Sequence, residues 1–357
     1  MDAKFIHDAF IIKGTELTHS TNNLLKKQGK MNMNHLTIQE RTIIRQITAE
    51  TNKKNIDNIS RTEAYFSFFK KNPDIIWSFL ASMVSRNGGW NMCDLQGAIF
   101  PQLLTDMTRK QLFLTYERAN WLIFHDIYPQ LLVYQYSTKL NRQMFHLLPY
   151  FHVSTFIQKE WSRYWKENDK ERLTTCLIIN EQNVIQTPVI DHPVYKKKVF
   201  QSKLFSFQDW LHFSCVLLPT CGGEVYGASV NGFNSLSKRI NLGKRLASIL
   251  FHPRLFPYFY EFAEKTPHTG SRNDYEQYFK IKTGQKTPIL RASFPIIEHN
   301  QHTYEDWSKH RRVSPAWLYL PARHRHPIHL TDWYFAKSNQ LQLLLALQKT
   351  LKLKKWK

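Results

Sequence analysis

The sequence predicts an all-α fold: a multi-helix globular bundle with a proline-rich loop excursion before the C-terminal helix. Apolar residues recur at helical spacing along most of the chain, whereas the two-residue alternation of a strand is scarce. Hydrophobic residues make up 42% of the 357 residues and aromatic residues 14%, which is enough for a large core. Eight of the 15 prolines lie within 253–327, where they disfavour helix.

These patterns divide the chain into an arm and a body. Residues 1–34 are polar, rich in Asn, Lys and Thr, and predict a loosely ordered N-terminal arm. Residues 35–357 predict a single helical domain, in which 266–330 form a loop-rich segment. No fixed-period repeat is present, so a solenoid is not expected.

Two capping boxes mark the first helices of the body. Thr37 and Glu40 have the spacing at which a hydroxyl and a carboxylate satisfy each other's backbone amides, and so do Ser60 and Glu63. The first pair predicts a helix start near residue 38. The second predicts a helix over 64–71.

The next helix is strongly apolar. Pro73 suits a first turn, and the run over 74–86 is apolar on nearly every side, which predicts a central helix. Gly88 and Gly89 predict that this helix ends in a left-handed cap, and Asp94 would begin the following one.

The remaining elements follow from caps and prolines. We expect a glycine-rich turn region over 219–235 and a strong C-terminal helix over 331–353, with lysines at its negative end. Other helices are expected over 94–104, from 108 through a kink at Pro129, over 154–170 and 171–179, in two runs within 195–218, over 241–251 and over 254–264.

Composition excludes several classes of protein. No stretch approaches the roughly 20 apolar residues of a membrane helix, and the N-terminus lacks a secretory layout, so we expect a cytoplasmic protein. The four cysteines contain no CxxC pair and are too scattered for a disulfide framework. Walker-A, GxGxxG, HExxH and GxSxG motifs are also missing from the sequence, and we expect no cofactor.

Charge is the strongest compositional signal. The formal net charge is +21, and residues 240–357 carry 20 basic against 8 acidic side chains, whereas 1–119 and 120–239 have excesses of only +5 and +4. Such a field attracts polyanions, with nucleic acid as the first choice of partner. Basicity that serves only solubility is the alternative.

The segment 85–94 is the first candidate site. Its glycines let backbone amides approach a ligand, its arginine offers a fork of donors, and its aspartate stands at an expected helix start. The alternative is a purely structural helix cap. The candidate ligand-binding or anion-binding residues are Arg86, Asn87, Gly88, Gly89, Asn91 and Asp94.

The string that runs from Arg86 to Met92, Arg-Asn-Gly-Gly-Trp-Asn-Met, also resembles a family of uncharacterised proteins from Bacillus-type bacteria. The likeness extends over most of the chain after the N-terminal arm. It implies a bacterial, cytoplasmic setting and supplies no catalytic residues that could be carried over to this chain.

The second candidate site is the Arg-His-Arg-His-Pro-Ile-His stretch over 323–329. His324, His326 and His329, with Asp332, have the donor types of a metal site. Arg323 and Arg325, with Arg311 and Arg312 upstream, would repel a bare cation, so the arginines favour an anion contact and no metal is expected. A solvated basic loop is the third interpretation.

These observations favour a cytoplasmic accessory protein that binds a polyanion through its basic C-terminal third. The alternative is an enzyme acting on a phosphorylated or anionic small substrate in a pocket formed by 85–94. Peripheral membrane contact through the C-terminal helix is not expected, because its leucines are expected to pack on the core. Catalytic residues cannot be assigned from the sequence.

Overall fold

A computed structural model describes residues 34–192, 215–229, 233–281, 287–300, 304–322 and 328–354. Contacts within the chain define two compact units, 1–45 and 46–357, and each is described by itself. Residues 1–33 of the expected arm lie outside the described residues, so the arm and the single-domain boundary at 35 stay predictions.

The capping box expected at Thr37 is present. The Thr37 amide donates to Glu40 Oε2 at 2.9 Å, and the Glu40 amide donates to Thr37 Oγ1 at 3.2 Å. Helix α3 (Ile38–Lys54) begins directly after Thr37. A local signal of two side chains therefore predicted this helix start correctly.

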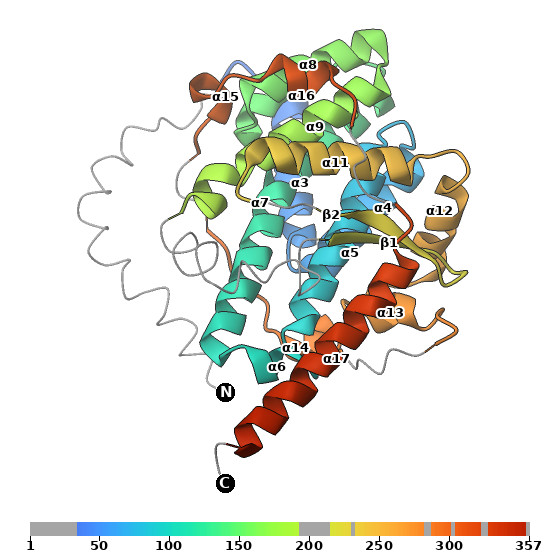
Figure 1. The fold of residues 1–357 in the computed structure, drawn as a ribbon. Helices are drawn as coiled ribbons and strands as arrows, with labels where there is room; N and C mark the ends of the chain where they lie inside the picture. The colour runs from blue at the N-terminus through green and yellow to red at the C-terminus, as the bar shows by residue number, and fades with distance from the viewer. Residues whose placement is uncertain are drawn as a thin grey trace, which may run out of the picture. The chain divides into compact units, whose positions relative to one another are not determined.

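The unit 46–357 is built mainly of helices, as Figure 1 shows, which confirms the predicted all-α class. Two further short elements are a 3₁₀ turn, η1 (Phe145–Phe151), and a π turn, η2 (Gln186–Ile190). The α-helices are α4 (Asn58–Lys71), α5 (Trp77–Asp94), α6 (Phe100–Leu103), α7 (Asp106–Lys139), α8 (Thr155–Glu167), α9 (Lys170–Val184), α11 (Leu236–Leu250), α12 (Phe256–Lys265), α13 (Asn273–Glu276), α14 (Leu290–Ser293), α15 (Trp307–His310), α16 (Pro315–Tyr319) and α17 (Thr331–Lys354).

Helix α5 corrects one sequence prediction. It passes through Gly88 and Gly89 without interruption and ends only at Asp94, so the expected helix end at these glycines is wrong. The glycines disfavour helix by roughly 1 kcal/mol each, but α5 is buried along almost its whole length, and packing outweighs propensity.

Several other expected helix starts are displaced. Asp57, not the Ser60 box, caps α4, because its carboxylate accepts the Ser60 amide at 2.7 Å. Thr105 caps α7 in place of Thr108, and Pro129 lies inside that helix without ending it. Ser235 caps α11 six residues before the expected cap at 241. In each case an Asp, Thr or Ser side chain three to six residues earlier caps the helix instead.

A two-stranded antiparallel hairpin was not expected. Strands β1 (Cys215–Pro219) and β2 (Val225–Ser229) pair so that Cys215 lies opposite Ser229. The turn region predicted over 219–235 is therefore partly strand, and so is the end of the helical run predicted within 195–218. Both faces of the hairpin are largely buried. Its strands therefore lack the alternation of apolar and polar residues that marks a half-exposed strand.

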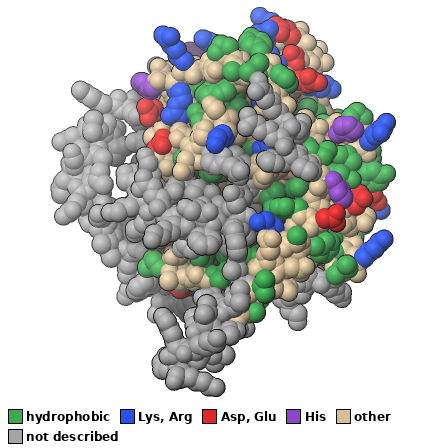
Figure 2. Space-filling model, viewed as in Figure 1, with side chains coloured by type: hydrophobic (Ala, Val, Ile, Leu, Met, Phe, Trp, Pro, Cys, Tyr) green, Lys and Arg blue, Asp and Glu red, His purple; other side chains and the backbone are tan. Residues whose placement is uncertain are grey.

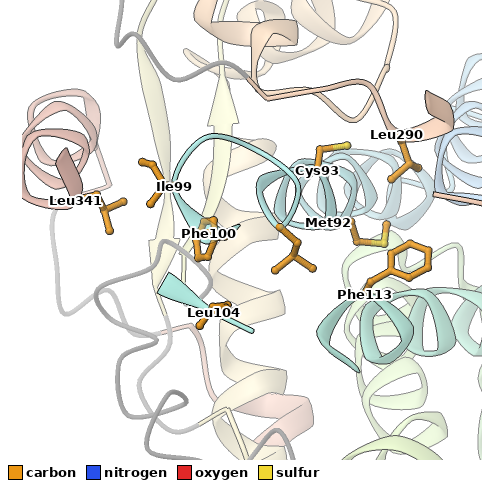
Figure 3. Close-up of a cluster of buried hydrophobic side chains, with 9 residues drawn as sticks. Met92, Cys93, Ile99, Phe100, Leu104, Phe113, Leu290 and Leu341 are labelled. Carbon is orange, nitrogen blue, oxygen red and sulfur yellow. The ribbon is translucent and has the colours of Figure 1, made fainter. Parts of the chain in front are cut away.

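The C-terminal end of α5 contributes to a hydrophobic cluster, drawn in Figure 3. Leu290 from α14 and Leu341 from α17 join this cluster, so segments late in the sequence pack with α5. Its buried members are Met92, Cys93, Leu95, Ile99, Phe100, Leu104, Phe113, Leu290 and Leu341.

Helix α17 matches the C-terminal helix predicted over 331–353 almost residue for residue. Within the described ranges, none of the helices is both long and apolar enough to cross a bilayer.

Candidate functional site

Arg86 of the 85–94 motif binds the end of a neighbouring helix. Its guanidinium donates from Nη1 to the Thr266 carbonyl at 2.9 Å and from Nη2 to the Ala263 carbonyl at 3.1 Å, where α12 ends. The side chain lies over the Phe262 ring, 5.5 Å from its centroid. Burial lowers the pKa of Arg86 to about 10, and the negative end of the α12 dipole stabilises its charge.

Asn87 pairs with a strand. Its Nδ2 donates to the Leu217 carbonyl at 2.8 Å, and its Oδ1 accepts the Leu217 amide at 2.7 Å. The side chain therefore satisfies both backbone groups of one β1 residue, as a neighbouring strand would.

Gly89 makes room for a polar pair. A Cβ atom at this position would lie 2.5 Å from Asn58 Oδ1 and 2.6 Å from His268 Nε2. Those two atoms are hydrogen-bonded to each other at 2.8 Å across α5. The glycine is thus required by the close approach of α4 and the segment after α12, and its left-handed freedom is not used.

Asp274 accepts donors from three directions. They are Trp90 Nε1 at 3.0 Å, the Thr269 amide at 3.1 Å and the His268 ring, whose Nδ1 is 3.2 Å from Asp274 Oδ2. These donors lower the pKa of Asp274 against the opposing effect of burial. Burial lowers the pKa of His268, and Asp274 opposes that shift.

Asp94 forms a buried ion pair with Arg272. Arg272 Nε donates to Asp94 Oδ1 at 2.7 Å, and Nη2 donates to Asp94 Oδ2 at 2.6 Å. Asn91 Oδ1 accepts a longer bond from the same Nη2 at 3.3 Å. Burial dominates the shift of Asp94 and raises its pKa, while Arg272 acts in the opposite direction.

The motif is thus a continuous buried contact surface for the hairpin and for residues 263–275. Each of its polar side chains is buried and is bound to protein atoms. None of the candidate ligand-binding side chains of this motif is exposed to solvent. The ligand pocket at 85–94 stays a prediction, and this burial gives it no support.

The second motif lies mostly outside the described residues, including Arg323, His324, Arg325 and His326. Of the rest, His329 Nε2 lies 3.2 Å from Thr331 Oγ1, its ring packs against Tyr226, and Asp332 is exposed. Within the described part of the chain, no three His, Cys, Asp or Glu residues are grouped to hold a metal ion.

Arg311 and Arg312 follow α15. Arg311 is half-buried and donates from Nη1 to Asn183 Oδ1 at 3.1 Å, and Arg312 is exposed. Lys309 is exposed as well. Of these three cations, none lies within 4.0 Å of a carboxylate of the described residues.

Sequence reasoning missed a polar network centred on Asp126 of α7. Asp126 Oδ2 accepts Asn180 Nδ2 at 2.6 Å and Gln130 Nε2 at 2.8 Å. Indole groups hold both amides in place: Trp307 donates to Asn180 Oδ1 at 3.0 Å, and Trp161 donates to Gln130 Oε1 at 2.9 Å. Burial raises the pKa of Asp126 to about 7.

Glu181 of α9 is a second buried carboxyl group with a raised pKa. Burial raises the pKa of Glu181 to about 7, and Trp77 Nε1 donates to its Oε2 at 3.2 Å. The Tyr65 hydroxyl is buried, is affected by the charges of both carboxyl groups, and has no hydrogen-bond partner among the described residues. Only the glutamine at i+4 from Asp126 hinted at this network, because its other members come from different helices.

Comparison with known proteins gives the family. Residues 53–335 match a family model described as "Protein of unknown function (DUF2515)". The chain is also similar to the "Uncharacterized protein YppC" of Bacillus subtilis (strain 168), with 46% identity over 325 residues, which cover 89% of this chain and 100% of that protein. No solved structure matches the chain. The match extends far beyond the 85–94 motif and confirms the resemblance drawn from it: the chain belongs to the DUF2515 family.

Proposed function

We propose that this protein is an accessory protein that binds nucleic acid, a polyanion, through the basic surface of its C-terminal third. One observation carries the proposal. Lys309, Arg311 and Arg312 lie in four consecutive positions, reach solvent at least in part, and have no carboxylate partner among the described residues. A short surface segment with three such cations is suited to contact successive phosphates.

Three other described cations of the C-terminal third are paired with carboxylates, which supports a narrower site than the sequence suggested. Arg272, Arg291 and Lys265 are paired with Asp94, Asp57 and Glu261. On the face drawn in Figure 2, the described Lys and Arg side chains are interspersed with Asp and Glu side chains. The proposal therefore rests on the segment 309–312 and not on the whole basic third.

The test is fluorescence anisotropy with labelled single-stranded and double-stranded DNA and RNA at 50 and 200 mM salt. Wild-type binding is expected to weaken steeply with salt. The K309Q/R311Q/R312Q variant should lower the slope of log K against log salt by about 3 for duplex DNA, since each lost contact removes about 0.9.

A matched control variant removes three positive charges at other exposed positions. Lys139, Arg142 and Arg254 are exposed and lie outside the segment 309–312, so K139Q/R142Q/R254Q should bind like wild type. Equal losses in the two variants would mean a general charge effect. Absent binding at 50 mM salt rejects the proposal, and binding to anionic vesicles or polyphosphate alone would replace nucleic acid by another polyanion.

A nucleic-acid partner in a bacterium is consistent with the cytoplasmic location expected from the sequence. For the enzyme alternative at 85–94, no observation of the described residues favours a substrate there.

A further inference from the structure

Arg239 of α11 is a buried cation that is held entirely by neutral oxygen atoms. Its Nε donates to Gln182 Oε1 at 2.9 Å, its Nη1 to the Phe233 carbonyl at 2.7 Å, and its Nη2 to the Gln186 side chain. The side chain is only 2% exposed. Burial lowers the pKa of Arg239 to about 10.

Arg311 and Arg239 hydrogen-bond to adjacent residues of α9. Arg239 is bound to Gln182 of α9, and Arg311 is bound to Asn183 at 3.1 Å. The charge of Arg311 also lowers the pKa of Arg239. Two like charges are thus placed together at the end of α9, which costs electrostatic energy unless an opposite charge is near.

The described surroundings offset this charge only in part. The Gln182 carbonyl at the end of α9 accepts Arg239 Nη2 at 3.4 Å, and Asp191 acts on Arg239 with the opposite charge. Asp191 is itself exposed and accepts Gln186 Nε2 at 3.0 Å. Arg311 has one acceptor, and the described residues offer no partner to its Nε and Nη2 groups.

We propose that Arg311 and Arg239 form a seat for an oxyanion, namely the phosphate group of a ligand. The free N–H groups of Arg311 would donate to two phosphate oxygens, which is the arrangement that a planar guanidinium favours. Arg239 is a positioning residue that adds positive potential, and the exposed Lys309 and Arg312 are neighbours of Arg311 in sequence. This inference rests on the proposed function and names the phosphate contact within it.

The experiment is isothermal titration of the full chain with pyrophosphate and inorganic phosphate, with potassium chloride as the control salt. Wild type is expected to bind pyrophosphate. R311Q should weaken binding by about tenfold or more, because it removes a charged two-point contact. R311K keeps the charge but loses the fork and should recover only part of the affinity. R142Q removes one exposed arginine elsewhere and should change nothing.

The outcomes separate this inference from the proposed function. Equal pyrophosphate affinity in wild type and R311Q overturns the seat, and so does nucleic-acid binding without any pyrophosphate binding. In both cases the wider proposal is decided separately by nucleic-acid binding, to which Lys309 and Arg312 can still contribute. If pyrophosphate binds at Arg311 but no nucleic acid binds, the seat stands and its ligand is a free phosphorylated molecule.

Discussion

The side-chain amide of Asn87 hydrogen-bonds both the amide and the carbonyl of Leu217. A residue in the middle of a helix thus completes the edge of a two-stranded sheet. The two residues are 130 positions apart in sequence, so this contact fixes the hairpin against α5.

Replacing Asn87 by Ala should destabilise the protein by about 2–4 kcal/mol, because two buried backbone groups lose their partners. Urea denaturation at constant m-value measures this loss. The substitution N339A at an exposed position of α17 is the control and should have little effect. A loss for N87A below about 0.5 kcal/mol would mean that water or another group replaces the amide.

Gly89→Ala should destabilise the protein by about 1–3 kcal/mol, although alanine favours helix, since the added methyl group would overlap the Asn58–His268 pair. Gly88→Ala is the matched control. Its nearest neighbour is Asn120 Nδ2 at 3.0 Å, the end of a half-buried side chain that can move aside. Thermal unfolding of both variants tests this difference, and equal melting temperatures would contradict it.

Arg272→Met should cost about 3–5 kcal/mol at pH 7, because it leaves the Asp94 carboxylate buried without its partner. The loss should shrink as the pH falls, since protonation then neutralises Asp94. The double variant D94L/R272M should be more stable than R272M alone. Denaturation curves at pH 5 and pH 7 provide the measurement, and a loss for R272M that does not depend on pH would argue against an uncompensated carboxylate.

The carboxyl groups of Asp126 and Glu181 predict a pH dependence of stability. Burial raises the pKa of each to about 7, from 3.8 and 4.5. The folded state therefore holds protons that the unfolded state releases, so these groups lower stability as the pH rises from about 4 to about 7.

Asp126→Asn and Glu181→Gln should each flatten this fall. Other groups titrate in the same range, so the quantity to compare is the difference in unfolding free energy between wild type and variant at each pH. Glu171→Gln, at an exposed position, is the control. Parallel profiles for D126N and wild type would show that Asp126 titrates normally.

Sequence signals predicted those helix ends that depend on neighbouring residues in the sequence. The box at Thr37 and the extent of α17 could be read from adjacent residues. The passage of α5 through Gly89 could not, because burial among distant segments decides it. The hairpin that begins at Cys215 could not be predicted either, because its strands are largely buried on both faces and lack the two-residue alternation.

The candidate sites show the same division. Composition could point to the basic segment around Arg311, because its three cations lie within four positions of the sequence. Composition could not show that Arg272 forms an ion pair with Asp94, or that Asn180 hydrogen-bonds to Asp126. These partners are 178 and 54 residues apart. Spacing along the chain carries no information about such pairs.

The distance in sequence between α5 and its partners has a consequence for synthesis on the ribosome. Arg86 and Trp90 bind groups that follow them by 180 and 184 positions. At roughly 5–20 residues per second, those groups emerge about ten to forty seconds after the helix. For that interval the nascent chain exposes a strongly apolar segment with unmatched charges, which is the kind of intermediate that chaperones recognise.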